Sequence, residues 1–369
     1  MSDMRELLIG ALLVGSSLMM PASQAIADPM SDAKAIIAKH QTMPVFTPPG
    51  EAFDAKTCMA NKKVLSIPIS MTIPFNVELQ KAMATAAKDV GFTYTTWDNQ
   101  LKPDQWMQGI SQAISQKYDV VDLAGGLNPE WVGPQLGEAR AAGVKVTTTH
   151  LYDATQTAAK SVDYSGKVNY TEAGKLLAAW AFVQTGGKPD VLIIGSSDVL
   201  PSIPFVKAIQ DELKTLCPEC KQTHLDVPVS DWATKIQPGT QSALLADPGL
   251  NYILPIYDSM SQFVIPAMRI TGVEGSVQLA SFNGTPFILD MVRNGQVQMD
   301  IGESLGWAGY AAIDNIMRML CGQPEVAKLN VPLLIFDKNN VKTAGVPANF
   351  NDGYGDSYLD GFHTLWKLK

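Results

Sequence analysis

Residues 62–98 read KKVLSIPISMTIPFNVELQKAMATAAKDVGFTYTTWD. The apolar, β-branched-rich run at 64–69 predicts a strand that is covered on both faces. An amphipathic helix follows as far as Gly91, a residue type that commonly ends helices, and 92–97 alternate like a second strand. In open α/β sheets, ligands bind at the carboxyl ends of the strands. The loop 70–76 lies at such an end and is therefore the first candidate site.

The rest of the chain repeats this alternation. Further strands are predicted at 119–123, 144–149, 190–195, 222–227, 251–256, 276–281, 296–301 and 331–336. The predicted helices are 76–90, 104–117, 130–142, 169–185, 202–215, 231–246, 259–271, 285–294 and 305–321, with a kink at Pro238. A chain of 369 residues can bury two cores. We therefore predict two Rossmann-like α/β lobes with parallel sheets and right-handed crossovers.

The amino terminus is typical of a signal peptide. Leu7 to Met20 is an apolar segment too short to span a bilayer comfortably, and 25–27 (Ala-Ile-Ala) supplies small residues before a cleavage site. We expect residues 1–27 to be removed and the protein to be exported; the alternative is a first helix packed on the protein. Residues 28–60 are predicted to form a surface arm with a short helix at 31–40.

Four cysteines suit an oxidising compartment. Cys217 and Cys220 lie in the sequence CPEC, where a zinc site would need further ligands that are absent nearby. A redox CxxC pair normally opens a helix, whereas this one closes a predicted helix, so a local disulfide is favoured. Cys58 and Cys321 remain. A disulfide between them would tie the segment before the first strand to the end of a late helix, and whether they pair stays open.

Several segments occur in an order typical of one family. They are 73–92 (IPFNVELQKAMATAAKDVGF), 120–150, the blocks that begin at Val191 and Asn251, 277–303 (VQLASFNGTPFILDMVRNGQVQMDIGE) and 306–326. The chain from about Lys62 to Asp337 thereby resembles the type I periplasmic sugar-binding proteins that serve ABC importers. The resemblance implies a periplasmic monomer without a cofactor or metal, which closes on a small molecule and docks on a permease in the inner membrane.

The resemblance also implies how the lobes are connected. The chain is expected to cross between lobes three times, near Asp163, near Glu303 and after Val331. The first lobe would comprise 61–163 plus 304–332, and the second lobe 164–303 plus 333–369. The ligand is expected in the cleft at these crossings.

Candidate ligand contacts follow from the strand ends and from the resemblance. Phe75 offers a ring to stack on a sugar and Asn76 an amide for hydroxyl pairs, unless they are a core residue and a helix cap. Asn128 and Trp131 follow the third strand, where a turn and a hydrophobic cover are the alternatives. His150 ends the fourth strand and is either a contact or a satisfied residue at the crossover.

The second lobe supplies the remaining candidates. Asn283, in SFNGTP, is the strongest of them. Asp258 serves either as a contact or as a helix cap, and the other candidates are Asp198, Tyr257, Glu303 and its stacking neighbour Trp307.

Three departures from the family pattern bear on the ligand. Ile73 stands where several sugar binders carry a polar residue, and Leu151 and Ile203 stand where ribose-type binders carry arginine. A carboxylate or phosphate would lose its bidentate partners. The resemblance therefore implies a neutral sugar or polyol, with a small amine or an aromatic-polar solute as the alternative because Glu303 and Asp258 are present.

Other functional classes are disfavoured. No nucleophile elbow, Walker loop or His-rich metal spacing indicates an enzyme. The net charge of −8 and the absence of a basic helix-turn-helix at the start argue against nucleic-acid binding. A binding protein that reports to a membrane sensor kinase would share the same fold and cleft, so that alternative to an importer stays open.

Overall fold

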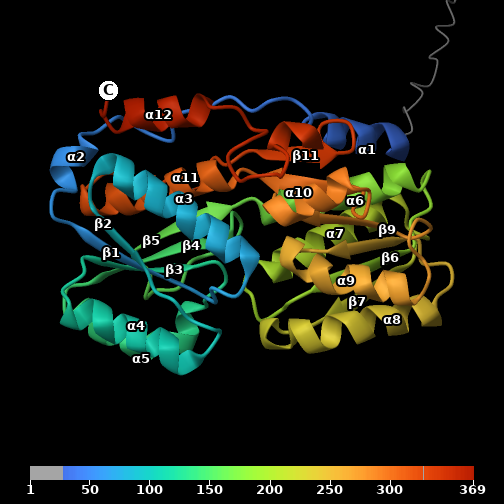
Figure 1. Cartoon of the computed structure of the whole chain (residues 1–369), viewed down its shortest axis with the longest axis horizontal. Coiled ribbons are helices and arrows are strands. Elements are labelled where there is room, and N and C mark those ends of the chain that lie inside the picture. The colour runs from blue at the N-terminus through green and yellow to red at the C-terminus, as the bar shows by residue number, and fades with distance from the viewer. Residues whose placement is uncertain (1–27, 327) are drawn as a thin grey trace, which may run out of the picture.

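The computed structural model describes residues 28–326 and 328–369, and it confirms two α/β lobes (Figure 1). The proposed signal peptide lies outside these residues. The first sheet is wholly parallel with the order β2-β1-β3-β4-β5. Its strands are β1 (Lys63–Pro68), β2 (Thr93–Thr96), β3 (Val120–Ala124), β4 (Lys145–Asp153) and β5 (Tyr164–Val168).

The second sheet has the order β11-β10-β9-β8-β6-β7, and only the β10–β11 pair is antiparallel. Its strands are β6 (Val191–Gly195), β7 (Gln222–Asp226), β8 (Tyr252–Pro255), β9 (Gln278–Phe282), β10 (Met299–Glu303) and β11 (Leu333–Asp337). In both sheets the parallel strands place their carboxyl ends toward the other lobe, so that loops from both lobes can meet.

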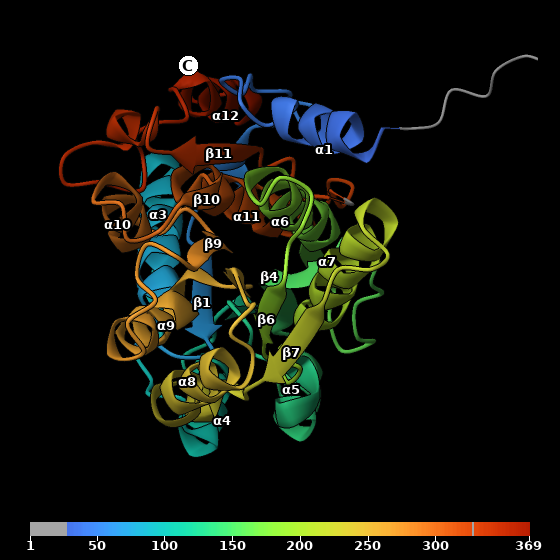
Figure 2. The same cartoon turned by 90° about the vertical axis from the view of Figure 1, so that its right-hand side faces the viewer.

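Helices cover both faces of each sheet (Figures 1 and 2). In the first lobe, α3 (Pro74–Val90) and α11 (Leu305–Leu320) cover one face, and α4 (Pro103–Ser115) and α5 (Gly133–Ala141) cover the other. In the second lobe, α6 (Tyr170–Gln184) and α7 (Ser202–Leu216) lie opposite α8 (Gln237–Ala246), α9 (Asp258–Ile270) and α10 (Pro286–Arg293). None of the helices among the described residues is long and apolar enough to cross a bilayer.

Both terminal segments run between the lobes. Helix α1 (Pro29–Ala38) packs on α6 and α7 of the second lobe, and the arm then reaches α2 (Ala55–Cys58) beside the first lobe (Figure 1). In the opposite direction, the chain leaves β11 and places α12 (Ser357–Leu365) on α11 of the first lobe. The arm and α12 share contacts, since the ring centroids of Phe46 and Phe362 lie 4.9 Å apart.

Three features differ from the sequence-based expectation. Residues 164–168, expected in the second lobe, form β5 of the first sheet, so the first crossing follows Val168 instead of Asp163. Helix α12 packs on the first lobe, although 333–369 was expected in the second, because its Tyr358, Phe362 and Trp366 complete an aromatic cluster with α11. The predicted helix 231–246 is not α-helical throughout: a π-helical turn at Trp232–Ile236 runs directly into α8, and Pro238 lies in the first turn of α8, a position that tolerates proline.

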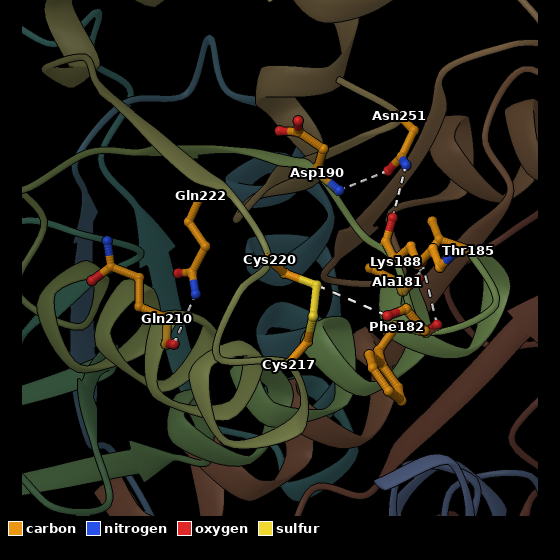
Figure 3. Close-up of a disulfide and its surroundings, with 11 residues drawn as sticks. Ala181, Phe182, Thr185, Lys188, Asp190, Gln210, Cys217, Cys220, Gln222 and Asn251 are labelled. Atoms are coloured by element: carbon orange, nitrogen blue, oxygen red, sulfur yellow. Dashed lines mark hydrogen bonds between the residues drawn. A yellow bond between two sulfur atoms is a disulfide. The ribbon is translucent and has the colours of Figure 1, made fainter. Parts of the chain in front are cut away.

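Both cysteine pairs are disulfides. Cys217–Cys220 follows α7, as expected for a local clamp on that turn, and Figure 3 shows it beside the loop after α6. Cys58–Cys321 joins the end of α2 to the residue that follows α11, over a sequence separation of 263 residues. The amino-terminal arm is therefore covalently attached to the first lobe.

Candidate ligand-binding cleft

A cavity lies between the lobes at the carboxyl ends of the strands. The two lobes also contact each other directly, since Gln156 Nε2 donates to the carbonyl oxygen of Leu200 at 2.8 Å. The cavity wall consists of Ile69, Ile73, Phe75, Asn76, Gly125, Gly126, His150, Tyr170, Val199, Val229, Trp232, Tyr257, Ser259 and Asn283.

The first lobe contributes the start of α3. Asn76 Nδ2 donates to the carbonyl oxygen of Ser70 at 2.9 Å, and its Oδ1 is buried without a partner among the described residues. Asn76 is not a helix cap, since the N-cap position of α3 is Ile73. Gly125 approaches the amide so closely, at a φ of +55°, that an added Cβ would collide with Oδ1. The amide is therefore held in place by contacts on two sides.

His150 forms the floor of the cavity where β4 leaves the first lobe. The register of β4 against β5 shifts between Thr149 and Tyr152, and His150 has a φ of +54°. Its Nε2 lies 2.5 Å from Glu303 Oε2 and its Nδ1 lies 2.5 Å from the Tyr170 hydroxyl. Its ring faces Phe75, with 4.6 Å between the centroids. His150 is thus both a cavity residue and a fully hydrogen-bonded residue at the crossover.

The two side chains hydrogen-bonded to the His150 ring come from two other elements. Tyr170 begins α6, Glu303 ends β10, and both are buried. Burial raises the pKa of Tyr170 well above its usual value, and the nearby Tyr257 and Glu303 add to that shift. The phenol therefore stays protonated and links α6 to the floor of the cavity.

The second lobe contributes Trp232, Tyr257, Ser259 and Asn283. Trp232 Nε1 donates to Ser196 Oγ at 2.9 Å, and the Tyr257 hydroxyl lies 3.0 Å from Ser202 Oγ. Both ring systems are thereby oriented with their polar tips toward the lobe. Ser259 Oγ and Asn283 Nδ2, in contrast, are buried and have no partner in the part of the chain that the structure describes. The backbone of Asn283 has a positive φ of 147°, which residues other than glycine seldom adopt.

Two predicted carboxylates lie behind the wall. Asp258 accepts from Ser281 Oγ at 2.6 Å and from the Thr285 N–H at 2.8 Å, so it joins the starts of α9 and α10 inside the lobe. Glu303 lies behind His150. Among the described residues that line the cavity, none carries a carboxylate, ammonium or guanidinium group.

The other predicted residues do not line the cavity. Asn128 caps a short 3₁₀ turn by accepting from the Glu130 N–H at 3.0 Å, and Asp198 accepts from Ser196 Oγ at 3.0 Å. Trp131 stacks on Trp106 at 5.7 Å and is exposed on its other side. Trp307 stacks on Tyr358 in the aromatic cluster of the first lobe.

Leu151 and Ile203, the two positions compared above with arginines of ribose-type binders, also lie outside the cavity wall. Ile203 is 58% exposed at the start of α7, and Leu151 is fully buried. Sequence reasoning also missed Tyr170, Trp232 and Ser259. Their positions carried a signal, since each follows a strand or a crossing, but Trp232 lay within the predicted helix 231–246, which concealed the loop.

Residues 64–324 match the model of a family described as the periplasmic binding protein domain. The chain belongs to this periplasmic binding protein family. No protein of curated function matches the sequence significantly. The match begins at β1 and ends after α11, so the amino-terminal arm and the segment from β11 onward lie outside it.

Solved structures of other proteins share this fold. An ABC transporter solute binding protein from Agrobacterium vitis, with bound allitol, has a TM-score of 0.66 at 19% identity over 77% of this chain and 98% of its own. One from Burkholderia graminis C4D1M, in complex with D-arabinose, has a TM-score of 0.66 at 22% identity over 76% and 97%. The Caulobacter myo-inositol binding protein has a TM-score of 0.66 at 18% identity over 77% and 95%. At these identities the likeness concerns the fold.

Proposed function

We propose that this protein captures a small neutral polar solute, a sugar or a polyol, between its lobes and delivers it to the permease of an ABC importer. The observation that carries the proposal is the cleft itself. Its wall contains Asn76 from one lobe and Asn283 from the other, together with the rings of Phe75 and Trp232, and each amide has an atom without a partner among the described residues. Amides pair with hydroxyl groups, and aromatic rings cover the C–H face of a sugar.

The lack of charged side chains among the described residues of the wall favours a neutral ligand. A buried ammonium or carboxylate needs a charged or strongly hydrogen-bonding partner. The two carboxylates that made an amine ligand an alternative are engaged elsewhere, Asp258 with Ser281 and Thr285, and Glu303 with His150. An amine would therefore find no counter-charge in the wall. The solved relatives named above hold allitol, D-arabinose and myo-inositol, all of them neutral.

Closure of the lobes supplies the capture step. The wall is divided between the lobes, so an open cleft exposes the amides to water and a closed one surrounds the ligand. The crossings after Val168 and after Glu303 lie beside His150, where the floor of the cavity is hydrogen-bonded to both. We propose that a permease in the inner membrane recognises the closed arrangement, and that residues 1–27 direct export to the periplasm.

A thermal-shift screen of the mature protein, beginning at Asp28, tests the ligand class. Sugars and polyols are compared with amines and aromatic acids. A ligand at a hundred times its dissociation constant should add about 2.7 kcal/mol of stability. A rise in melting temperature with amines alone, and with no sugar or polyol, would refute the proposal.

The site is tested by Asn283→Ala, which removes a buried amide that no protein group satisfies. We expect binding to weaken roughly 10-fold while the fold remains, because a ligand hydroxyl loses its partner. Asn128→Ala is the matched control: it removes an amide outside the cavity and should lower stability without changing the ligand-induced shift. An unaltered affinity in Asn283→Ala would remove this residue from the site.

The importer is tested in cells. Deletion of the gene should abolish uptake of the radiolabelled ligand found in the screen, and expression of the wild-type chain should restore it. Normal uptake combined with a lost transcriptional response to the ligand would instead identify a membrane sensor as the partner.

A further inference from the structure

The polar atoms of the ring systems in the cavity wall are hydrogen-bonded to other groups of the protein. Trp232 Nε1 donates to Ser196 Oγ and to the carbonyl oxygen of Val227, and the Tyr257 hydroxyl pairs with Ser202. Both nitrogens of His150 are occupied, by Glu303 and by the hydroxyl of Tyr170. Together with Phe75, these residues therefore present carbon faces to whatever enters the cavity.

The aliphatic part of the wall extends this apolar surface. Ile69 and Ile73 come from the first lobe, and Val199 and Val229 from the second. Ile73 is the position where a polar residue was expected from the family resemblance. The apolar side chains lie in both lobes, so in a closed cleft they would contact the ligand from two sides.

The polar side chains of the wall are few. Beyond the ring systems, they comprise the amides of Asn76 and Asn283 and the hydroxyl of Ser259, each with a polar atom that has no partner among the described residues. A sugar or inositol with a hydroxyl on every ring carbon has more hydrogen-bonding groups than two amides and one hydroxyl can satisfy. Each hydroxyl buried against carbon would lose its water without gaining a partner, which costs about tenfold in affinity.

We propose that the cavity selects a sparsely hydroxylated neutral solute, such as a deoxy sugar or a cyclic diol, over its fully hydroxylated counterpart. This inference rests on the proposed function and narrows its ligand class. The two amides and Ser259 would hold a small set of hydroxyls, and the deoxygenated face of the ligand would lie on the rings and aliphatic side chains.

Calorimetric titration of the mature protein with matched pairs tests this preference. The pairs are 2-deoxy-D-ribose with D-ribose, 6-deoxygalactose with galactose, and cis-1,2-cyclohexanediol with myo-inositol. For the pair that fits the cavity, the deoxygenated member should bind at least about 10-fold tighter, because the first two pairs differ by one hydroxyl and the third pair differs by four. Equal or tighter binding of the hydroxylated members overturns this inference alone. Binding of no member of any pair overturns the proposed function as well.

A near-isosteric substitution tests whether the wall is the source of the preference. Val199→Thr adds one hydroxyl to the cavity and should shift the affinity ratio several-fold toward the hydroxylated member. Val45→Thr makes the same change on the arm, where Val45 is 81% exposed, and should leave the ratio unchanged. A ratio that moves equally in both variants, or in neither, would refute the role assigned to the wall.

Discussion

The two disulfides should contribute very different amounts to the free energy of unfolding. Cys58–Cys321 closes a loop with a sequence separation of 263 residues, and Cys217–Cys220 closes one of 3. In the chain-entropy description, a cross-link stabilises by reducing the freedom of the unfolded chain, and the effect grows with the logarithm of loop length. For these separations it amounts to about 5.6 and about 1.6 kcal/mol. The difference is about 4 kcal/mol.

The comparison uses two double variants, Cys58→Ala with Cys321→Ala, and Cys217→Ala with Cys220→Ala. Each removes two sulfur atoms, so the variants serve as controls for each other. Urea unfolding of the ligand-free protein, followed by tryptophan fluorescence, gives the midpoint and the slope with denaturant concentration. Tryptophans report on both lobes, since Trp366 lies in the first and Trp180 in the second.

The first variant should lose most of its stability and the second only a small part. In the first, the transition of the lobe that contains Trp366 should shift further, because the bridge attaches the arm to α11 of that lobe. Equal losses in the two variants, or a larger loss on removal of Cys217–Cys220, would refute the loop-entropy reasoning.

Two further predictions concern the cavity wall and the core behind it. Gly125→Ala should lower stability by about 1 kcal/mol, because alanine is strained at positive φ, and should also weaken ligand binding, because its Cβ would displace the Asn76 amide. Gly143→Ala, also at positive φ but with no atom within 4 Å of the new Cβ, should lower stability alone; loss of binding in both variants would contradict this. Burial, together with the neighbouring Asp258 carboxylate, raises the pKa of Asp300 well above its usual value. The unfolded chain then loses this proton at lower pH than the folded one, so the stability from Asp300 is present below pH ~4 and declines as pH rises. Asp300→Asn should flatten the fall in melting temperature between pH 4 and pH 8, and Asp104→Asn, at an exposed position, should not; a steeper fall in Asp300→Asn would contradict the sign.

Much of the fold was predictable from the sequence because the signals are local. The apolar run at 64–69 and the helix that ends at Gly91 reflect burial and backbone preferences that a short segment carries by itself. Strand β5 was not predictable in this way. Its sequence, YSGKV, has little apolar character, and it becomes a strand because β4 offers an unpaired edge. Helix α12 likewise depends on the aromatic cluster that it joins on the first lobe.

In the candidate site, too, some features follow from local sequence signals and others depend on distant contacts. The sequence indicated that polar and aromatic residues follow the strands, and Phe75, Asn76, His150, Tyr257 and Asn283 line the cavity. Which of these side chains are hydrogen-bonded within the protein became visible only once the lobes were assembled. Asp258 and Asn283 both follow strands of the second lobe, yet Asp258 is satisfied by Ser281 and Thr285, whereas Asn283 Nδ2 has no partner among the described residues. This is because hydrogen-bond satisfaction depends on neighbours distant in the chain, which no local pattern records.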